Sequence, residues 1–265
     1  MKKFIFFFTG FVTTLAFYSF NTNNRVDDLL KELGIPEAQA KNYIWKSFIG
    51  EAFSLPSNPN IENYPKNKRA TAVQVIGAYV KDYLTSADFV KEYQKLREER
   101  KPKLPASVEE RIKKEIDNLY LALKEAEDAS RKASTELKSI YEASIRKYKQ
   151  SINALENDYD PQHAAQIEGI VTQYDYDMSD YRFRLKQFEK KYPADVKVFI
   201  RNRLQDFLQL SSTIDFDADL KPGSDREKFA SAYEEKPQAW KYCFLAGKDA
   251  TTAARKLAAK WMKEI

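Results

Sequence analysis

The chain has 265 residues, of which 43 % are hydrophobic and 31 % charged, with a formal net charge of +5. This balance is typical of a folded protein with a core, and it excludes a disordered tail. No segment forms the basic stripe that phosphate neutralisation needs, so nucleic acid is not expected as a partner. Seven glycines are few for this length and favour helices over all-β or Rossmann-type folds, whose turns and phosphate loops need glycine.

Residues 1–20 have the pattern of an export signal. Met1-Lys2-Lys3 is a positive start, and Phe4–Phe20 contains no charge. Two interpretations stay open: a cleaved signal peptide, or an uncleaved N-terminal membrane anchor near the short limit of about 17 residues for spanning a bilayer. We therefore expect an exported protein of the periplasm or outer cell envelope, with possible attachment to the membrane through residues 4–20.

Residues 25–104 are predicted to form an N-terminal helical segment. A short helix over residues 26–33 is closed by Gly34, and Pro36 opens a second one. Residues 55–66 carry three prolines and three asparagines and are predicted to be a loop. A third helix follows, and Ser86 is placed to cap a fourth that ends before Pro102.

Residues 105–211 are predicted to form a long antiparallel, coiled-coil-like helical hairpin. The capping box Ser107-Val108-Glu109-Glu110 starts the outgoing helix, which is expected to run unbroken over about 106–158. A turn at residues 157–161 leads to a returning helix over 162–192, which either stops there or extends to residue 211 past a kink at Pro193. The end near residues 150–170 is then the part expected to reach a partner.

Both predicted arms carry an apolar seam, in which residues alternate at spacings of four and three. The seam of the returning helix is Ile167, Val171, Tyr174, Met178, Tyr181, Leu185, Phe188 and Tyr192. The seam of the outgoing helix includes Ile112, Ile116, Leu119, Leu123, Ala126, Ser130, Ala133, Leu137 and Ile140. The small middle layer of the outgoing arm is expected to face the large side chains of the returning one.

Residues 212–265 are predicted to form C-terminal helices that pack with 25–104. Residues 212–223 form a loop, Ser224–Glu227 is a second capping box, and a final helix spans Ala250–Lys263. No strand of useful length is expected. The predicted fold class is an all-α helical bundle with the hairpin as its distinctive part.

Catalytic and metal-binding patterns are incomplete. Asp215, Asp217 and Asp219 resemble the first half of a calcium loop, but Leu220 and Arg226 replace the glycine and glutamate that would complete it. Gly247-Lys248 lacks the rest of a phosphate loop. We predict no metal site, no cofactor and no catalytic residue.

Other candidate residues favour structural roles. Cys243 is the only cysteine, lies in an apolar run and is predicted to be a buried thiol, while the only histidine, His163, is far from it in sequence. Asp175, Asp177 and Asp180 are expected on a solvated helix face. Tyrosines on or beside the seams are either helix contacts or the lining of a groove for polypeptide or sugar: Tyr141, Tyr148, Tyr174, Tyr181 and Tyr192.

These patterns favour a non-enzymatic exported protein that acts in assembly or partner binding at the cell envelope, with a protein partner or a second copy of itself. The alternative is a periplasmic holdase-type chaperone that clamps clients between tyrosine-rich arms. A third hypothesis is a helical enzyme of unknown reaction, whose polar residues meet only in the fold.

Overall fold

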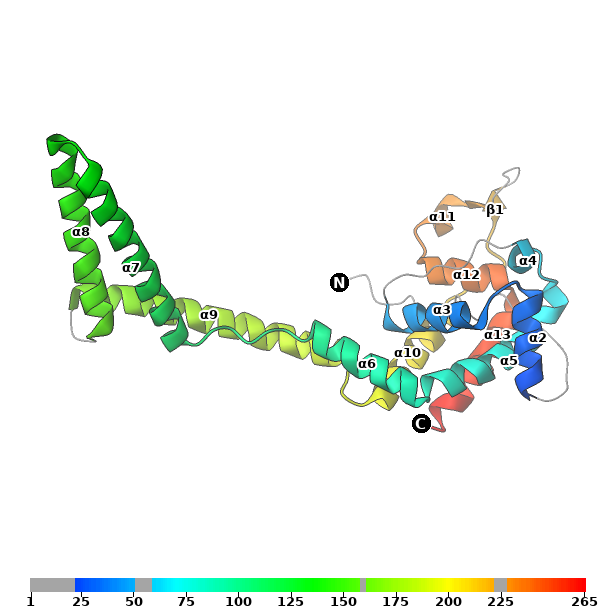
Figure 1. The fold of residues 1–265 in the computed structure, drawn as a ribbon. Coiled ribbons are helices and arrows are strands. Elements are labelled where there is room, and N and C mark those ends of the chain that lie inside the picture. The colour runs from blue at the N-terminus through cyan, green and yellow to red at the C-terminus, as the bar shows by residue number, and fades with distance from the viewer. Residues whose placement is uncertain (1–21, 51–58, 158–160, 222–227) are drawn as a thin grey trace. The chain divides into compact units, whose positions relative to one another are not determined.

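The computed structural model describes residues 22–50, 59–157, 161–221 and 228–265. Within these ranges the chain is all-α, as predicted, apart from one antiparallel pair of two-residue strands in which Leu220 faces Phe229 (Figure 1). The predicted export segment 1–20 and the predicted capping box at residues 224–227 lie outside the described residues.

The chain divides into two compact units, residues 1–99 with 192–265, and residues 100–191. We call the first the body and the second the hairpin unit. The hairpin unit contains α7 (Val108–Lys132), α8 (Thr135–Glu156) and α9 (Pro161–Lys191). The elements of the body are α2 (Thr22–Glu32), α3 (Glu37–Ile49), α4 (Pro59–Glu62), α5 (Lys66–Leu84), α6 (Ala87–Arg100), α10 (Val196–Ser211), β1 (Leu220–Lys221), β2 (Lys228–Phe229), α11 (Ser231–Glu234), α12 (Gln238–Ala246) and α13 (Lys248–Met262).

The body is held together by the last helix, α13, which packs on α5, α10 and α12 (Figure 1). The alanines at positions 250, 254 and 258 are buried, as the predicted inner face of this helix requires, and Trp261 is 2 % exposed. An ideal Cβ built on Gly77 of α5 would lie 1.9 Å from Leu257 Cδ2 of α13. The missing side chain of Gly77 therefore allows the two helices to approach closely.

Aromatic contacts anchor the chain where it re-enters the body at residue 192. The ring of Tyr93 on α6 lies 4.6 Å from that of Phe199 on α10, and its hydroxyl donates a 2.8 Å hydrogen bond to the Pro193 carbonyl. Arg97 Nε donates to the Tyr192 carbonyl at 2.9 Å. Burial raises the pKa of Tyr93, so its hydroxyl stays a donor at neutral pH.

The outgoing arm differs from the prediction, because it is two helices and not one. α7 ends at Lys132, Ala133 and Ser134 have extended backbone angles, and α8 begins at Thr135. The local sequence explains the break: Arg131 and Lys132 occupy the last turn of α7, and Ser134 stands at the N-cap position of α8. Basic residues favour a helix C-terminus, so the end of α7 is stabilised here. Serine is a preferred N-cap residue, although the Ser134 side chain makes no capping hydrogen bond to α8.

The hairpin pair is therefore α7 with α8, and the turn between these two helices lies at residues 133–134. The predicted turn at residues 157–161 lies for the most part outside the described residues. The two helices lie side by side, with Glu127 paired to Lys149 at 3.0 Å and the Tyr120 hydroxyl donating to Glu156 at 3.0 Å (Figure 1). α9 packs on both as a third helix. Of the small middle layer, Ser130 is buried, and Ala133 lies in the turn between α7 and α8.

The extension past Pro193 also differs from the structure. α9 ends at Lys191, and α10 packs on α13 and α12 inside the body. The apolar stripe of α10 belongs to the core of the body, where Phe199, Ile200 and Leu204 are at most 1 % exposed. The returning arm accordingly stops before residue 192.

The close approach at Gly77 gives a stability prediction. Gly77→Val should lower the free energy of unfolding of the body by about 2 kcal/mol, because overpacking a filled contact costs about 1–3 kcal/mol. Gly169→Val on α9 is the matched control, since nothing lies within 4 Å of its added Cβ, and it should change stability by less than about 0.5 kcal/mol. Denaturant unfolding followed by hydrogen exchange in α5 and α13 measures both; equal losses would contradict the role given to Gly77.

Candidate functional site

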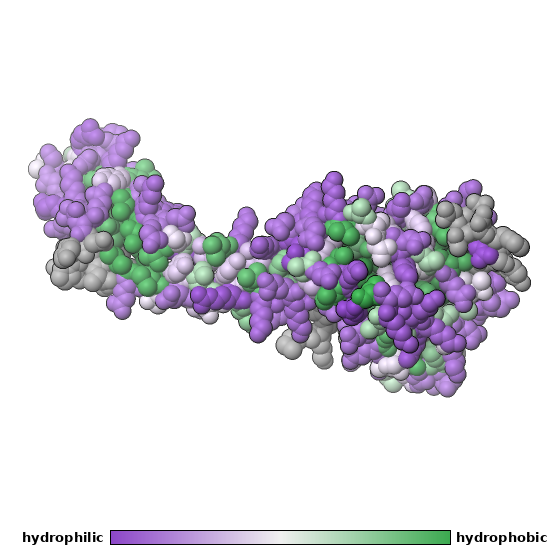
Figure 2. Space-filling view, turned by 90° about the horizontal axis from the view of Figure 1, so that it is seen from below, coloured by the Kyte–Doolittle hydropathy of each residue, from purple (hydrophilic) through white to green (hydrophobic). Residues whose placement is uncertain are grey.

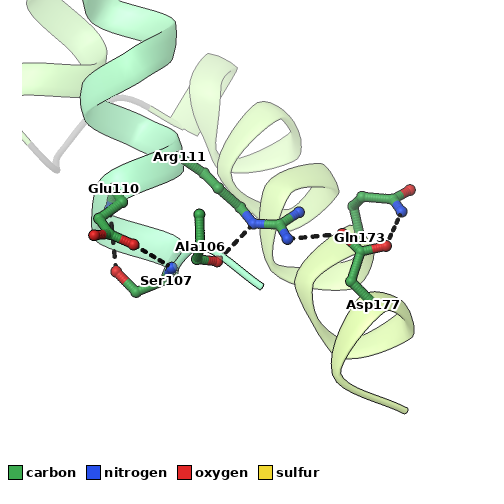
Figure 3. Close-up of polar contacts among 6 residues, drawn as sticks. All are labelled: Ala106, Ser107, Glu110, Arg111, Gln173 and Asp177. Atoms are coloured by element: carbon green, nitrogen blue, oxygen red, sulfur yellow. Dashed lines mark hydrogen bonds and ion pairs between the residues drawn. The ribbon is translucent and has the colours of Figure 1, made fainter. Parts of the chain in front are cut away.

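The start of α7 is fixed by the capping box predicted from the sequence. Glu110 N donates to Ser107 Oγ at 3.2 Å, and Ser107 N donates to Glu110 Oε2 at 2.8 Å (Figure 3). Two amide groups that the first turn leaves without helical partners are thereby satisfied. This start places Arg111 in the first turn of α7, on the side that meets α9.

Arg111 joins the two helices through an ion pair. Its Nη2 donates to Asp177 Oδ2 at 2.7 Å, and its Nε donates to the Ala106 carbonyl at 2.9 Å (Figure 3). The guanidinium also lies 5.6 Å from the centroid of the Tyr174 ring, within the range of a cation–π contact. The same side chain thus contacts the connector before α7 and two residues of α9.

Asp177 is held in its ionised form at this joint. Gln173, four residues earlier on the same helix face, donates from Nε2 to Asp177 Oδ1 at 2.9 Å. The hydrogen bonds from Arg111 and then from Gln173 lower the pKa of Asp177 below its usual value of 3.8. Sequence reasoning placed Asp177 on a solvated face and missed this contact, because its partner is far away along the chain.

A cleft of about 370 Å³ opens beside this joint, lined by Arg111, Glu115, Gly169, Ile170 and Gln173. Its one cation is already bound to Asp177 and to the Ala106 carbonyl. Among the described lining residues Glu115 supplies one carboxylate, and no hydroxyl, thiol or imidazole accompanies it. The arrangement positions α9 against α7, and its chemistry is that of a helix joint.

The most distinctive surface of the hairpin unit is apolar. Every large hydrophobic side chain that is exposed in the described part of the chain belongs to residues 100–191: Leu104, Tyr120, Leu121, Leu137, Ile140, Val171, Tyr176 and Phe183. The same unit contributes few side chains to the buried core, namely Ile152, Ala154, Leu155 and Phe188. Figure 2 shows green, apolar residues reaching the surface of the hairpin unit.

Leu137 and Ile140 were predicted as seam residues, yet they are 50 % and 61 % exposed. They lie one turn apart in the first two turns of α8, next to the turn at 133–134. We call Leu137 and Ile140 the hairpin-end patch.

Cys243 and the aspartates of the incomplete calcium-loop pattern belong to the body. Cys243 is a buried free cysteine, which confirms the predicted buried thiol. Its backbone carbonyl accepts a 2.8 Å hydrogen bond from Thr251 Oγ1. Asp215 accepts from the Tyr233 hydroxyl at 2.8 Å and from Asp217 N at 3.0 Å. Among the described residues no group of three or more His, Cys, Asp or Glu side chains could hold a metal ion.

The remaining candidates are distributed along the chain. Gly247 has a φ of 93° and stands at the N-cap of α13. Asp175 and Asp180 are exposed on α9, and the side chain of His163 lies outside the described residues. The seam tyrosines do not share one environment, because Tyr192 is buried whereas the other four are half-buried: Tyr141, Tyr148, Tyr174 and Tyr181.

Comparisons with protein-family models, with curated proteins and with solved structures found no match. Among the described residues, none of the helices combines the length and the apolar character needed to cross a membrane.

The joint predicts a titration shift. In Arg111→Met the pKa of Asp177 should rise towards 3.8, because the largest cause of its depression is lost. Since the pKa is lowered in the folded state, the contact stabilises fully above about pH 3.8 and is lost as the pH falls through the depressed value. Carboxyl NMR titration of Asp177 measures this. Arg131→Met, which removes an exposed partner of Asp128, should leave the pKa of Asp177 unchanged.

Proposed function

We propose that the chain is an exported, non-enzymatic helical protein that acts in assembly or partner binding at the cell envelope, and that the hairpin unit is its docking part. The observation that carries this proposal is the concentration of exposed large apolar side chains in residues 100–191. Isolated exposed apolar residues are ordinary on any protein, but their confinement to one unit is not expected from chance exposure.

The body supports the contrast. Several of its large aromatic side chains are at most 2 % exposed, namely Tyr93, Phe89, Phe199, Trp240 and Trp261. The hairpin unit has long helices, exposes several large apolar side chains and buries only a few of its residues. Apolar side chains that a unit cannot bury itself are the ones that a protein partner buries in an interface.

The polar groups of the candidate sites make contacts within the chain. The cleft beside Arg111 has its cation engaged, and Asp215 of the body loop accepts hydrogen bonds from a tyrosine hydroxyl and a backbone amide. Enzyme sites instead gather titratable groups of perturbed pKa around a concave pocket. The described residues thus favour recognition over chemistry.

The hairpin end should contact a partner directly. A photo-cross-linking residue at Ile140 should give an adduct of discrete mass in the native envelope, whereas the same residue at the exposed Lys256 of the body should give none. Leu137→Ser should reduce the yield of the Ile140 adduct several-fold, since it removes half of the hairpin-end patch.

Equal adducts at both positions, or none at Ile140, would contradict a docking role for this end. A broad smear of adducts, together with suppressed aggregation of a denatured client, would favour the holdase-type chaperone instead. Glu136→Ser, which changes a neighbouring charged residue in the same turn, is the matched control and should keep the Ile140 yield.

Export through residues 4–20 is a separate expectation. Phe7→Asp places a charge in the apolar segment and should move most of the protein from the envelope fraction to the cytoplasm, because export signals require an uninterrupted apolar core. Asn24→Asp adds the same charge just beyond the segment and should leave the distribution unchanged. Cell fractionation with quantitative immunoblotting measures both; an unaltered distribution for Phe7→Asp would refute export by this segment.

A further inference from the structure

α9 carries a second apolar line besides its seam. Tyr176 and Phe183 are 71 % and 63 % exposed, the former being the most exposed large hydrophobic residue of the described chain. They are one heptad apart on a continuous helix, so they lie on the same face, about 10 Å apart along the axis.

This line does not belong to the packing inside the hairpin unit. The seam residues Tyr174, Met178 and Tyr181 are half-buried. Tyr176 lies two residues from Tyr174 and from Met178, which rotates it by about 160–200° around the helix. The exposed line is therefore on the side of α9 opposite its own seam. We call Tyr176 and Phe183 the outer line.

The charges of α9 are segregated along its length. All charged residues of α9 from 168 to 180 are acidic, whereas those after 181 are basic with one exception, Glu189. The acidic residues are Glu168, Asp175, Asp177 and Asp180, and the basic ones are Arg182, Arg184, Lys186, Lys190 and Lys191. The helix dipole favours this order only within the first and last turns, so it does not account for the charges in the middle of the helix.

We propose that the outer line is a self-association surface, on which α9 of a second copy of this chain binds in the antiparallel direction about a two-fold axis near residues 179 and 180. In that arrangement Tyr176 of each copy packs on Phe183 of the other. The acidic half of each helix then lies beside the basic half of its partner copy. This inference deepens the proposed docking role by naming the partner of one of its surfaces.

The flanking charges fit the antiparallel arrangement in detail. Asp175 and Arg182 are exposed, one heptad apart, and lie on the same flank of the outer line. A two-fold axis keeps equivalent flanks of two antiparallel helices together, so Asp175 of each copy comes within reach of Arg182 of the other. Ser179, close to the axis, is small enough to allow close approach. A parallel pair would instead place like charges opposite one another.

The other flank already has contacts within the unit. Arg184 pairs with Asp180 at 2.7 Å and Asp177 pairs with Arg111. Changes to Asp175 and Arg182 therefore test association without disturbing the joint between α7 and α9. Two aromatic anchors form a narrow surface, and we expect a reversible dimer with a dissociation constant on the order of 10 µM.

Charge reversal tests the proposal. In sedimentation velocity from about 1 to 100 µM, the purified protein should shift from monomer to dimer. Asp175→Arg alone and Arg182→Asp alone should each weaken association by at least about tenfold, because each copy then opposes like charges twice. An equimolar mixture of these two variants should regain dimerisation, since both pairs are again opposite in sign. Lys256→Asp in the body should behave as the unaltered protein.

Engineered cysteines test the direction. Ser179→Cys should form a disulfide between copies under mild oxidation, whereas Gln187→Cys, on the same face, should not, because antiparallel pairing separates the two Gln187 positions by about 20 Å. Cys243 is buried and does not compete. Disulfides of equal yield in both variants would indicate a parallel pair and overturn the proposal, as would a disulfide in Gln187→Cys alone.

The following outcomes separate this inference from the docking role itself. A monomer at all concentrations, with the Ile140 adduct retained, refutes self-association through α9 but leaves the hairpin-end patch as a docking site. A dimer that persists unchanged in both charge-reversal variants also refutes the outer line. Loss of the Ile140 adduct with dimerisation intact refutes the hairpin-end patch alone.

Discussion

The break at Ala133 and Ser134 is the constraint on which the rest of the hairpin unit depends. Because α7 ends there, the chain reverses after 25 residues of helix, and α8 covers the seam of α7. α9 is then a third helix that packs on a pair already formed, instead of being the only cover for a long arm. Both the joint through Arg111 and the exposure of the outer line follow from this order of packing.

Two kinds of local signal compete at this break, which explains why sequence periodicity alone missed it. The four-three alternation continues through Ala133, Leu137 and Ile140, so the apolar pattern predicts an uninterrupted helix. The capping signals, Arg131 and Lys132 before Ser134, predict a stop and a start, and the structure follows them. Leu137 and Ile140 are exposed because the apolar pattern continues past residue 132, whereas the helix that carries it, α7, ends there.

Local features were otherwise predictable. The Ser107 capping box, the Ser86 cap, which accepts from Phe89 N at 3.2 Å, and the positive φ of Gly34 each depend on a few neighbouring residues. The all-α class follows from composition and periodicity in the same way. The ion pair between Arg111 and Asp177 was not predictable, because it requires knowing which face of α9 meets α7. The hairpin-end patch and the outer line consist of apolar side chains that no other helix of the described chain covers. A local sequence pattern does not show which side chains these are.

Exposure of apolar side chains also links stability to binding. A unit that buries few residues of its own is expected to open locally at lower free energy than the body, since local stability tracks buried contacts. A partner that binds only the closed form then stabilises it by mass action, in proportion to the logarithm of its concentration above the dissociation constant. Binding of a partner and closing of the hairpin unit are therefore coupled steps of the same equilibrium. Burial of Tyr176 and Phe183 by a second copy would therefore protect the amides of α9 from exchange as well as change the mass of the particle.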